Sequence, residues 1–362
     1  MRVGYGIIGT GMMGIEHAMN LDVTAGAEVV ACADPNEEPR EWIRPVLPKG
    51  TPVYAETGEL LARDDVDVVV IASPNFTHRE VLEEVMASGK HILVEKPMCT
   101  TFEDAAFVHE AALRYPGLFQ VGLEYRYMAP ITRLAAEVKG GTAGRLHMIA
   151  IREHRFPFLP KVGDWNRFRR NSGGTFVEKC CHFFDLMRLL ADAEPLRIYA
   201  SAGQDVNHLD ESYGGETPDI EDNGFVTVDF ENGVRAMLDL CMFAEGSREE
   251  QEVSVVGDRG KLEAFIPSSR FVLGKRQPKS VETEVVHVAE TVLKAGFHHG
   301  ATYYQHQALL ASLKSGRPPE VDSWDGLLSV VMGLAAQVSA EERRVVEISE
   351  FDLPARTGTF VA

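Results

Sequence analysis

The feature that most constrains the fold is a glycine pattern near the amino terminus, set between two apolar segments. Residues 3–9 read VGYGIIG, which predicts a short strand, and lead into Gly9, Gly11 and Gly14 in the spacing G-x-G-x-x-G. The helical stretch IEHAMNL follows, and the apolar segment AEVVACAD then ends at Asp34, twenty residues after Gly14. A strand, a glycine turn, a helix and a second strand ending in an acid are typical of a dinucleotide-binding unit.

Each part of this pattern has a physical role. Gly9 permits the tight turn, Gly11 lets the backbone approach a pyrophosphate, and Gly14 lets helix and strand pack closely. The helix N-terminus favours anions through its free N–H groups and its dipole, and Asp34 is placed to accept hydrogen bonds from a ribose diol. The alternative is a tight turn without a ligand, but the flanking elements favour a cofactor loop. Its residues are Gly9, Thr10, Gly11, Met12, Met13 and Gly14.

Apolar strands and amphipathic helices continue to alternate up to about residue 125. The expected elements are a strand within 65–73, a helix at 77–89, a strand at 91–95, a helix at 101–115 and a strand at 118–124. Thr77 and Glu80 are expected to form a capping box, and Gly89 to end that helix. This alternation predicts a doubly wound parallel sheet, with ligands at the carboxyl ends of the strands. The polar segments at those ends are 73–78, 95–97 and 124–127.

The pattern changes after this region, so we divide the chain into a Rossmann domain at 1–125 and a second domain at 126–362. Strand-like segments dominate the second part, and the Asn-Gly signal in FENGV predicts a hairpin. We therefore expect an α+β domain with a large open mixed or antiparallel sheet, for substrate binding and oligomerisation. Late helices are expected at 301–316 and 324–344, and a long mobile loop at 208–223.

Composition excludes some classes of function. The formal net charge is −18, from 36 Lys and Arg against 54 Asp and Glu, which opposes binding to nucleic acid or an anionic membrane. No apolar run is long enough to span a bilayer, and the start of the chain lacks signal-peptide features. The five cysteines form no CxxC pair. Reduced thiols and a cytoplasmic location are the simplest expectation.

The stretch SGGTFVEKCCHFFDLMRLL, residues 172–190, places Glu178, His182 and Asp185 at spacings of four and three. On a helix these groups would share one face. A metal site is disfavoured, because one histidine on a helical face is poor for zinc. Proton transfer and a purely structural role remain open, since histidine has the intrinsic pKa of a general base, whereas buried polar residues also anchor helices.

These motifs together resemble the glucose–fructose oxidoreductase/inositol dehydrogenase (Gfo/Idh/MocA) family over essentially the whole chain. The resemblance is carried by GIIGTGMMG (6–14), IASPNFTH (71–78), GKHILVEKP (89–97), SGGTFVEKCCHFFD (172–185) and DGLLSV (325–330). It implies a Rossmann domain followed by a domain built on a large open sheet. It also implies an NAD(P)-dependent dehydrogenase or reductase of sugars, polyols or their derivatives, which forms a homodimer or homotetramer.

By the same resemblance, Lys96 and His182 are the catalytic residues, and the Lys96–Pro97 peptide bond is cis. Glu178 stands where many members have Asp, so it is expected to bind substrate with a longer reach. The resemblance also implies that Arg126 lies near the nicotinamide end. The remaining residues implied to contact the cofactor are Ser73, Pro74, Asn75, His78, Glu95 and Lys96. Asp185 is either structural or the partner of His182.

Two further residues are candidates from their own chemistry. Trp165 has an aromatic face that could stack on a sugar, with a packing role as the alternative. His299, in FHHGATYY, is taken as a substrate contact, although an exposed loop histidine is the alternative.

The expected function is therefore an NAD-dependent dehydrogenase acting on a secondary hydroxyl of a sugar, inositol or related polyol, without a metal. Asp34 favours NAD over NADP, because its carboxylate repels a 2′-phosphate, and Arg40 could partly offset this. Two alternatives are an enzyme that keeps NAD bound for glycoside cleavage or elimination, and a dinucleotide-binding sensor. The presence of both Lys96 and His182 argues against the sensor.

Overall fold

The computed structural model describes residues 2–357 and contains two sheets. The first is the predicted doubly wound sheet, with strand order β3-β2-β1-β4-β5-β6 and parallel pairing throughout. Its central strands β1 and β4 are buried at every position except Val3 because helices cover both faces. The strands are β1 Val3–Ile8, β2 Ala27–Ala33, β3 Val53–Tyr54, β4 Val68–Ile71, β5 His91–Glu95 and β6 Phe119–Gly122.

The helices of this domain begin close to the carboxyl ends of the strands. They are α1 Met12–Asp22, α2 Glu37–Ile43, η1 Arg44–Val46, α3 Thr57–Leu61, η2 Asn75–Thr77, α4 His78–Ser88 and α5 Phe102–Ala112. Gly89 ends α4 with a positive φ of 73°, as predicted. The predicted Thr77–Glu80 capping box is wrong. The Thr77 hydroxyl lies instead against Ser73 Oγ and the Pro74 carbonyl, because the preceding turn is itself helical.

The second sheet is mixed, as predicted, with order β14-β13-β12-β11-β7-β10-β9-β8-β15. Only the β7–β10 pair is parallel among the strands of this sheet in residues 2–357. The predicted Asn-Gly hairpin joins β9 to β10, and Gly233 has a φ of 84° there. The strands are β7 Leu146–His154, β8 Pro195–Gly203, β9 Asn223–Phe230, β10 Arg235–Cys241, β11 Gln251–Gly257, β12 Gly260–Ile266, β13 Arg270–Lys275, β14 Ser280–Val285 and β15 Val346–Glu347.

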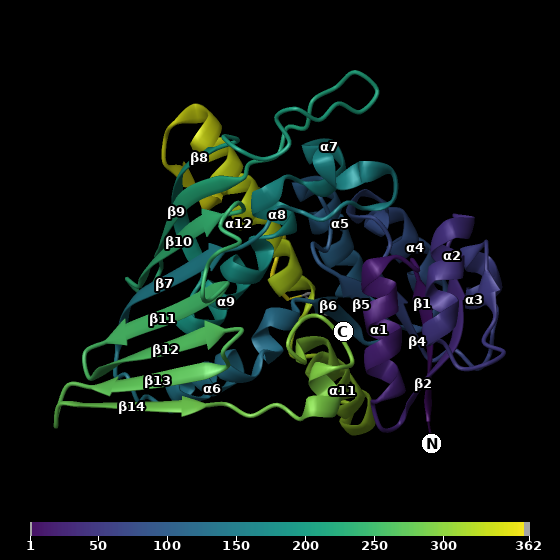
Figure 1. Ribbon diagram of the computed structural model, residues 1–362, viewed down its shortest axis with the longest axis horizontal. Helices are drawn as coiled ribbons and strands as arrows, with labels where there is room; N and C mark the ends of the chain where they lie inside the picture. Colours follow the sequence, from purple (N-terminus) through teal and green to yellow (C-terminus); the bar gives the residue numbers. More distant parts are fainter. Residues whose placement is uncertain (1, 358–362) are drawn as a thin grey trace.

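A layer of helices lies between this sheet and the Rossmann domain, and the opposite face of the sheet is open (Figure 1). The remaining helices are η3 Glu124–Tyr127, α6 Ala129–Lys139, η4 Val162–Arg167, α7 Arg169–Ser172, α8 Thr175–Glu178, α9 Cys181–Ala191, α10 Glu290–Leu293, α11 Ala301–Ser315, α12 Ser323–Glu342 and η5 Ile348–Glu350. The stretch 172–190 is therefore not one helix. It breaks after Glu178, where the Cys180 N–H donates to the Thr175 carbonyl five residues back.

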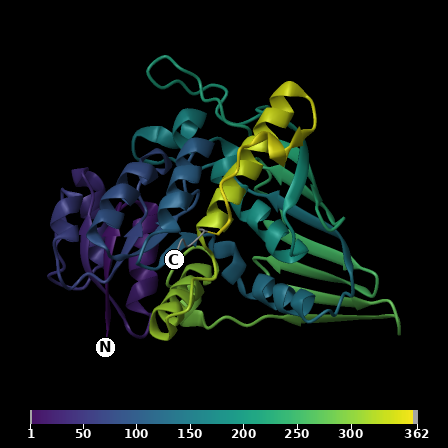
Figure 2. The same ribbon diagram turned by 180° about the vertical axis from the view of Figure 1, so that it is seen from behind.

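The last two long helices return to the Rossmann domain, so the second part of the chain is not a separate lobe (Figure 2). Leu309 and Leu310 of α11 join the same buried cluster as Ile7 of β1. Helix α12 crosses between the Rossmann domain and the large sheet (Figure 2). The segment that leads into α12 is hydrogen-bonded to β6, because the Val121 N–H donates to the Val321 carbonyl at 3.1 Å. The boundary predicted at residue 125 falls inside η3.

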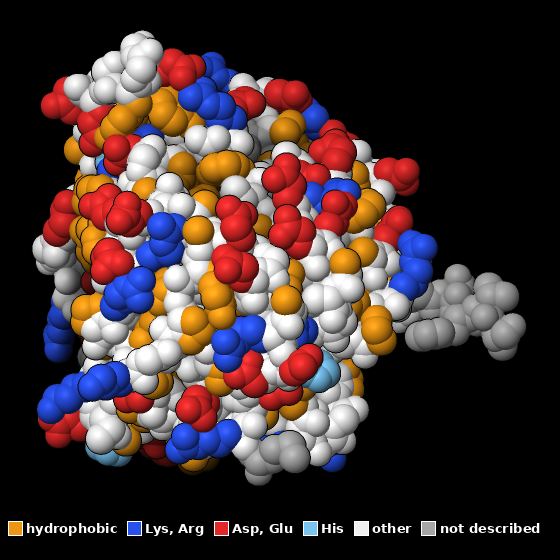
Figure 3. All heavy atoms as spheres, turned by 90° about the vertical axis from the view of Figure 1, so that its right-hand side faces the viewer, with side chains coloured by type: hydrophobic (Ala, Val, Ile, Leu, Met, Phe, Trp, Pro, Cys, Tyr) orange, Lys and Arg blue, Asp and Glu red, His pale blue; other side chains and the backbone are white. Residues whose placement is uncertain are grey.

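The surface carries the acidic excess expected from composition. Acidic side chains are spread over the Rossmann side of the molecule, with basic ones between them (Figure 3). The segment predicted as a long loop, 208–223, connects β8 to β9 and contains one isolated bridge, Tyr213–Glu216. Within residues 2–357, no helix combines the length and the apolar character that a bilayer crossing demands.

Candidate active site

The glycine loop connects β1 to α1 at the carboxyl edge of the parallel sheet. Gly9 has a φ of 90°, and a side chain there would lie 2.5 Å from the backbone of Ala72. A side chain at Gly14 would overlap the Gly9 carbonyl, so helix and strand pack closely, as predicted. A Cβ at Gly11 would meet no protein atom within 4 Å. Internal packing therefore does not demand a glycine at position 11, whereas close approach of a pyrophosphate would. The loop fits the predicted cofactor.

Asp34 lies beside this loop and is only 7% exposed. Its Oδ2 accepts a hydrogen bond from the Thr10 N–H at 2.8 Å, and its Oδ1 accepts one from the Asn36 N–H at 2.9 Å. The Arg40 guanidinium donates to the carbonyls of Asp34 and Pro35 at 2.7 and 2.9 Å. The carboxylate is thus fixed next to the glycine turn with a cation close by. Its binding of a ribose diol stays a prediction.

The predicted groove residues after β4 divide into two groups. Ser73 and Pro74 are partly exposed. His78 is fully buried, and its ring nitrogens lie 2.9 and 3.0 Å from the carbonyls of Pro97 and Ser73. Burial lowers the His78 pKa, and a neutral ring donates its single N–H to one of these two carbonyls. The Asn75 amide donates to the Ser172 carbonyl at 3.2 Å, which joins the two domains. Direct cofactor contact by these residues stays a prediction.

Glu95 ends β5 and Lys96 follows it, and the Lys96–Pro97 bond is cis, as the resemblance implied. Glu95 Oε1 lies 2.9 Å from His17 Nε2. Lys96 extends into the second domain, where its Nζ donates to the Glu178 carbonyl at 3.0 Å. Burial by itself would lower the Lys96 pKa, but the neighbouring carboxylates and the Cys181 thiol outweigh it and raise the pKa. Lys96 therefore stays protonated at neutral pH.

His182 lies in the first turn of α9 and is 2% exposed. Its ring stacks on the Tyr125 ring, with 4.0 Å between centroids and 9° between planes. Burial, helped by the charges of Lys96 and Lys179, holds the His182 pKa well below its usual value, so the ring is neutral. Glu178 is also buried, and burial raises its pKa despite the nearby lysines. The structure thus brings Lys96, Glu178 and His182 together.

Four residues in the site were not assigned by the sequence analysis. Glu124 and Tyr125 lie in the inspected segment 124–127, but only Arg126 was assigned there. Lys179 donates from Nζ to the Tyr125 hydroxyl at 2.5 Å and lies 2.9 Å from Glu153 Oε1. Burial and the nearby Arg155 charge lower the Lys179 pKa to about 8. The fourth residue is His298. It precedes His299 in the His-His pair of the segment FHHGATYY, in which only His299 was predicted to contact substrate.

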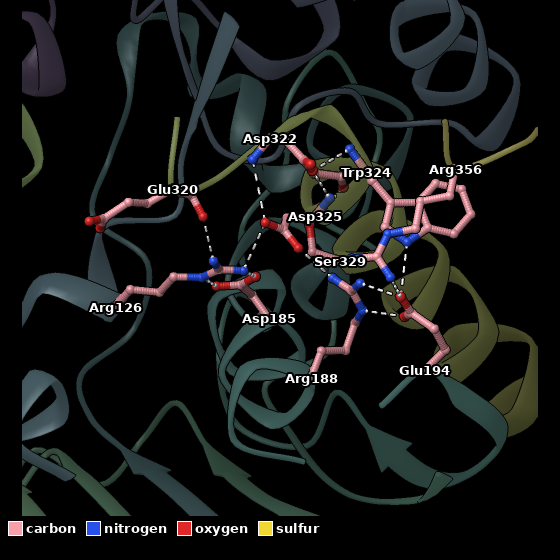
Figure 4. Close-up of polar contacts among 11 residues, drawn as sticks. Arg126, Asp185, Arg188, Glu194, Glu320, Asp322, Trp324, Asp325, Ser329 and Arg356 are labelled. Carbon is pink, nitrogen blue, oxygen red and sulfur yellow. Dashed lines mark hydrogen bonds and ion pairs between the residues drawn. The ribbon is translucent and has the colours of Figure 1, made fainter. Parts of the chain in front are cut away.

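Arg126 lies in a network of ion pairs and hydrogen bonds, and its position near the nicotinamide stays a prediction. Its Nε donates to Asp185 Oδ2 at 2.6 Å, its Nη1 donates to the Glu320 carbonyl at 2.9 Å, and its Nη2 lies 3.1 Å from Asp325 Oδ2. Figure 4 shows this network, which continues through Arg188 to Glu194. All three guanidinium nitrogens are engaged, so Arg126 links η3 to α9 and to the start of α12. Asp185 pairs with Arg126, and not with His182.

The two other candidate substrate contacts stand apart from this cluster. Trp165 is half-buried in η4, with its ring edge toward Phe76 at 6.3 Å between centroids. His299 is half-buried with a positive φ of 54°, and burial lowers its pKa. His298, and not His299, approaches Glu124. Sugar stacking by Trp165 and substrate binding by His299 stay predictions.

The arrangement can move a proton but has no metal-binding geometry. Among the residues described by the structure, no three His, Cys, Asp or Glu side chains converge on a point that could hold an ion. A neutral imidazole next to a protonated lysine can take a proton from a hydroxyl while the lysine stabilises the resulting negative charge. The five cysteines are free thiols, and four of them are buried.

Comparisons with known proteins agree with this geometry. Residues 3–123 match the Gfo/Idh/MocA model described as "Oxidoreductase family, NAD-binding Rossmann fold". Residues 136–348 match the model described as "Oxidoreductase family, C-terminal alpha/beta domain". The chain is 26% identical over 351 residues to myo-inositol 2-dehydrogenase of Thermotoga maritima, covering 97% of this chain and 99% of that protein.

Solved structures show the same fold. A probable dehydrogenase from Thermotoga maritima aligns with a TM-score of 0.79 at 26% identity, covering 96% of this chain and 100% of that one. Levoglucosan dehydrogenase, in complex with NADH and levoglucosan, aligns with a TM-score of 0.83 at 17% identity, again covering 96% and 100%.

The first prediction concerns the buried ion pair. Asp185→Asn should lower the free energy of unfolding by roughly 3–5 kcal/mol, because it leaves the buried Arg126 charge without its main partner. Urea unfolding followed by fluorescence measures this. The control is Asp229→Asn, whose partner Arg197 is exposed, and it should change stability little. Equal stability of the two variants would contradict a structural role for the pair.

Proposed function

Because the chain belongs to the Gfo/Idh/MocA oxidoreductase family, we propose that it is a dehydrogenase that oxidises a secondary hydroxyl of a sugar, inositol or related polyol, with NAD as the preferred cofactor. The observation that carries the proposal is the meeting of Lys96, from the Rossmann domain, with Glu178 and His182, from the second domain. The name of the Thermotoga maritima relative, myo-inositol 2-dehydrogenase, supports the substrate class.

The bound nicotinamide would accept a hydride from the carbon that carries the hydroxyl. His182 is the base that takes the hydroxyl proton, because its lowered pKa keeps it neutral. Lys96 is the electrophilic partner, because its raised pKa keeps it charged beside the developing alkoxide. Glu178 orients the substrate by bonding a neighbouring hydroxyl. The opposite pKa shifts of His182 and Lys96 support this division of roles.

The loop residues Gly9–Gly14 would hold the pyrophosphate, and Asp34 the adenosine ribose. We propose no metal in the reaction, so a chelator should leave turnover unchanged. Activity lost on chelation and restored by a divalent ion would overturn this part of the proposal.

The second prediction tests catalysis. His182→Ala and Lys96→Met should each lower kcat by roughly a hundredfold or more, the usual contribution of general acid–base catalysis. The measurement is the absorbance of reduced nicotinamide with a panel of polyols and both cofactors. His182→Ala should bind NAD normally, since His182 lies outside the Rossmann domain. The control is His109→Gln, a buried histidine that contacts Ser323 and should keep wild-type turnover.

Three results would contradict this proposal. Near-normal turnover in His182→Ala would return His182 to a structural role. Substrate conversion without net formation of reduced nicotinamide would indicate cleavage or elimination with a retained cofactor. Dinucleotide binding without turnover of any polyol would support a sensor.

The third prediction concerns cofactor choice. The wild-type kcat/KM should be higher with NAD than with NADP, and Asp34→Ser should reduce that ratio, because it removes the charge that repels a 2′-phosphate. The control is Asp67→Ser, since Asp67 also accepts a backbone N–H, that of Gly4 at 2.8 Å, but at the opposite end of β1. An Asp34→Ser enzyme with an unchanged ratio, or a wild type that prefers NADP, would show that Asp34 does not select the cofactor.

The fourth prediction is that a second copy of the chain covers the open sheet face. Four adjacent strands in the order β7-β10-β9-β8 expose large apolar side chains there, namely Met148 (58%), Met237 (41%), Phe225 (61%) and Tyr199 (45%). Such patches mark protein contacts. Phe225→Lys should shift the mass measured by light scattering toward the monomer, whereas Trp42→Lys on α2 should not. A monomeric wild type would contradict this interface.

A further inference from the structure

Glu124 is a buried carboxylate that the proposed chemistry does not yet use. It is the first residue of η3, directly after β6, and is 1% exposed. Its Oε1 lies 3.6 Å from His182 Nε2 on one side and 3.9 Å from His298 Nε2 on the other. Its Oε2 is buried without a hydrogen-bond partner among residues 2–357. A buried, unpaired carboxylate is costly, and such groups concentrate at functional sites.

His298 continues the path from Glu124 to the surface. Its Nδ1 lies 2.9 Å from Glu16 Oε1 in α1. That oxygen also accepts hydrogen bonds from the Thr302 hydroxyl at 3.0 Å and the Phe297 N–H at 3.1 Å, so Glu16 is firmly held. The His298 side chain is 28% exposed, whereas the side chains of Glu124 and His182 are 1% and 2% exposed. Among these groups, His298 is therefore the one that reaches solvent.

We propose that Glu124 and His298 form a proton relay that carries the proton released by the substrate hydroxyl from His182 to solvent. This inference rests on the proposed dehydrogenase function. The C–H bond breaks and its electron pair leaves with the hydride to the nicotinamide. The O–H bond breaks and its proton binds His182 Nε2. The same nitrogen then releases the proton to Glu124 Oε1, from which it passes to His298 Nε2 and on to water.

The separations of 3.6 and 3.9 Å exceed a direct hydrogen bond. A small rotation of the Glu124 carboxyl would shorten each separation to a hydrogen bond. Without such a path, His182 would keep the proton, because the stack on Tyr125 and the surrounding protein separate it from bulk solvent.

The pKa of Glu124 lies above that of His182, which favours transfer of the proton outward from His182. His182 has a pKa well below its usual value because it is buried. Burial and the neighbouring Glu95 charge raise the Glu124 pKa to about 7, against the opposing charges of His298 and Lys96. Burial alone would lower the His298 pKa, but the hydrogen bond and charge of Glu16, with Glu124, raise it. The charged and titratable groups around Glu124 are Glu95 at the end of β5, Lys96 directly after it, Tyr125 of η3, Cys181 and His182 of α9, and His298 from the segment before α11.

The test compares Glu124→Gln, which keeps the shape but cannot ionise, with Glu124→Asp, which can. In the wild type, kcat for oxidation should fall as pH drops through about 7, because protonated Glu124 cannot accept a proton. In Glu124→Gln, kcat should be about tenfold to a hundredfold lower. The fall of kcat with decreasing pH should then occur at a lower pH, where His182 itself is protonated. Glu124→Asp should keep the fall of kcat near the wild-type pH and recover part of the wild-type kcat.

Controls separate a relay from a structural role. Glu249→Gln removes another buried carboxylate, 5% exposed and on the approach to β11, and should leave both kcat and its pH profile unchanged. In His298→Ala, imidazole in solution should restore turnover, because the lost group is partly exposed. A Glu124→Gln enzyme with the wild-type dependence of kcat on pH would overturn the relay. A lower kcat that still falls at the wild-type pH would also overturn it. Failure of imidazole to restore His298→Ala would also overturn it.

A substrate-free measurement distinguishes failure of the relay from failure of the proposed function. In histidine-labelled protein followed by NMR, the His298 pKa should be lower in Glu124→Gln than in the wild type, because a carboxylate that stabilises the imidazolium is gone. An unchanged His298 pKa would overturn the coupling whatever the substrate is. A shifted pKa in a protein that oxidises no polyol would instead refute the dehydrogenase proposal and keep the Glu124–His298 coupling.

Discussion

The Arg126–Asp185 ion pair is the contact on which the geometry of the site depends. Arg126 follows the last strand of the Rossmann domain, and Asp185 belongs to α9 of the second domain. Glu124 precedes Arg126 by two residues and His182 precedes Asp185 by three, so one bidentate pair aligns the turns that carry both. The side chains are 11% and 1% exposed, and a pair so far removed from water holds only while both charges are present.

Burial governs the chemistry of the remaining groups. Removing an ionisable side chain from water favours its neutral form, and a nearby opposite charge favours its charged form. In this site the two effects give different results for neighbouring residues. His182 lies near cations and becomes neutral, whereas Lys96 lies near carboxylates and stays charged. Lys179 is intermediate, since burial lowers its pKa to about 8 while Glu153 supports its charge. The protein thus holds a neutral imidazole and a charged lysine in one buried site.

The parts of the site that could be predicted from the sequence depend on short-range geometry or on motifs of the family. The Gly9–Gly14 loop needs particular residues because strand, turn and helix are consecutive, and the structure confirms the close packing at Gly14. Lys96 and His182 were found from the resemblance, and the structure brings them to one site. The pattern of apolar segments likewise predicted both sheets. A strand buried on both faces is a continuous apolar run, and a strand buried on one face alternates apolar and polar residues.

The sequence by itself determined the parallel sheet, the mixed sheet, the glycine loop and the identity of Lys96 and His182 as candidates. Only the tertiary structure decided which polar side chains face one another. Arg126 meets Asp185 across 59 residues of chain, and His17 meets His306 across 289. Glu124 lies between His182 and His298 for the same reason. Such contacts depend on how the second domain packs back onto the first, and no local period or spacing records that packing. Only that packing pairs Arg126 with Asp185 and places His298 beside Glu124.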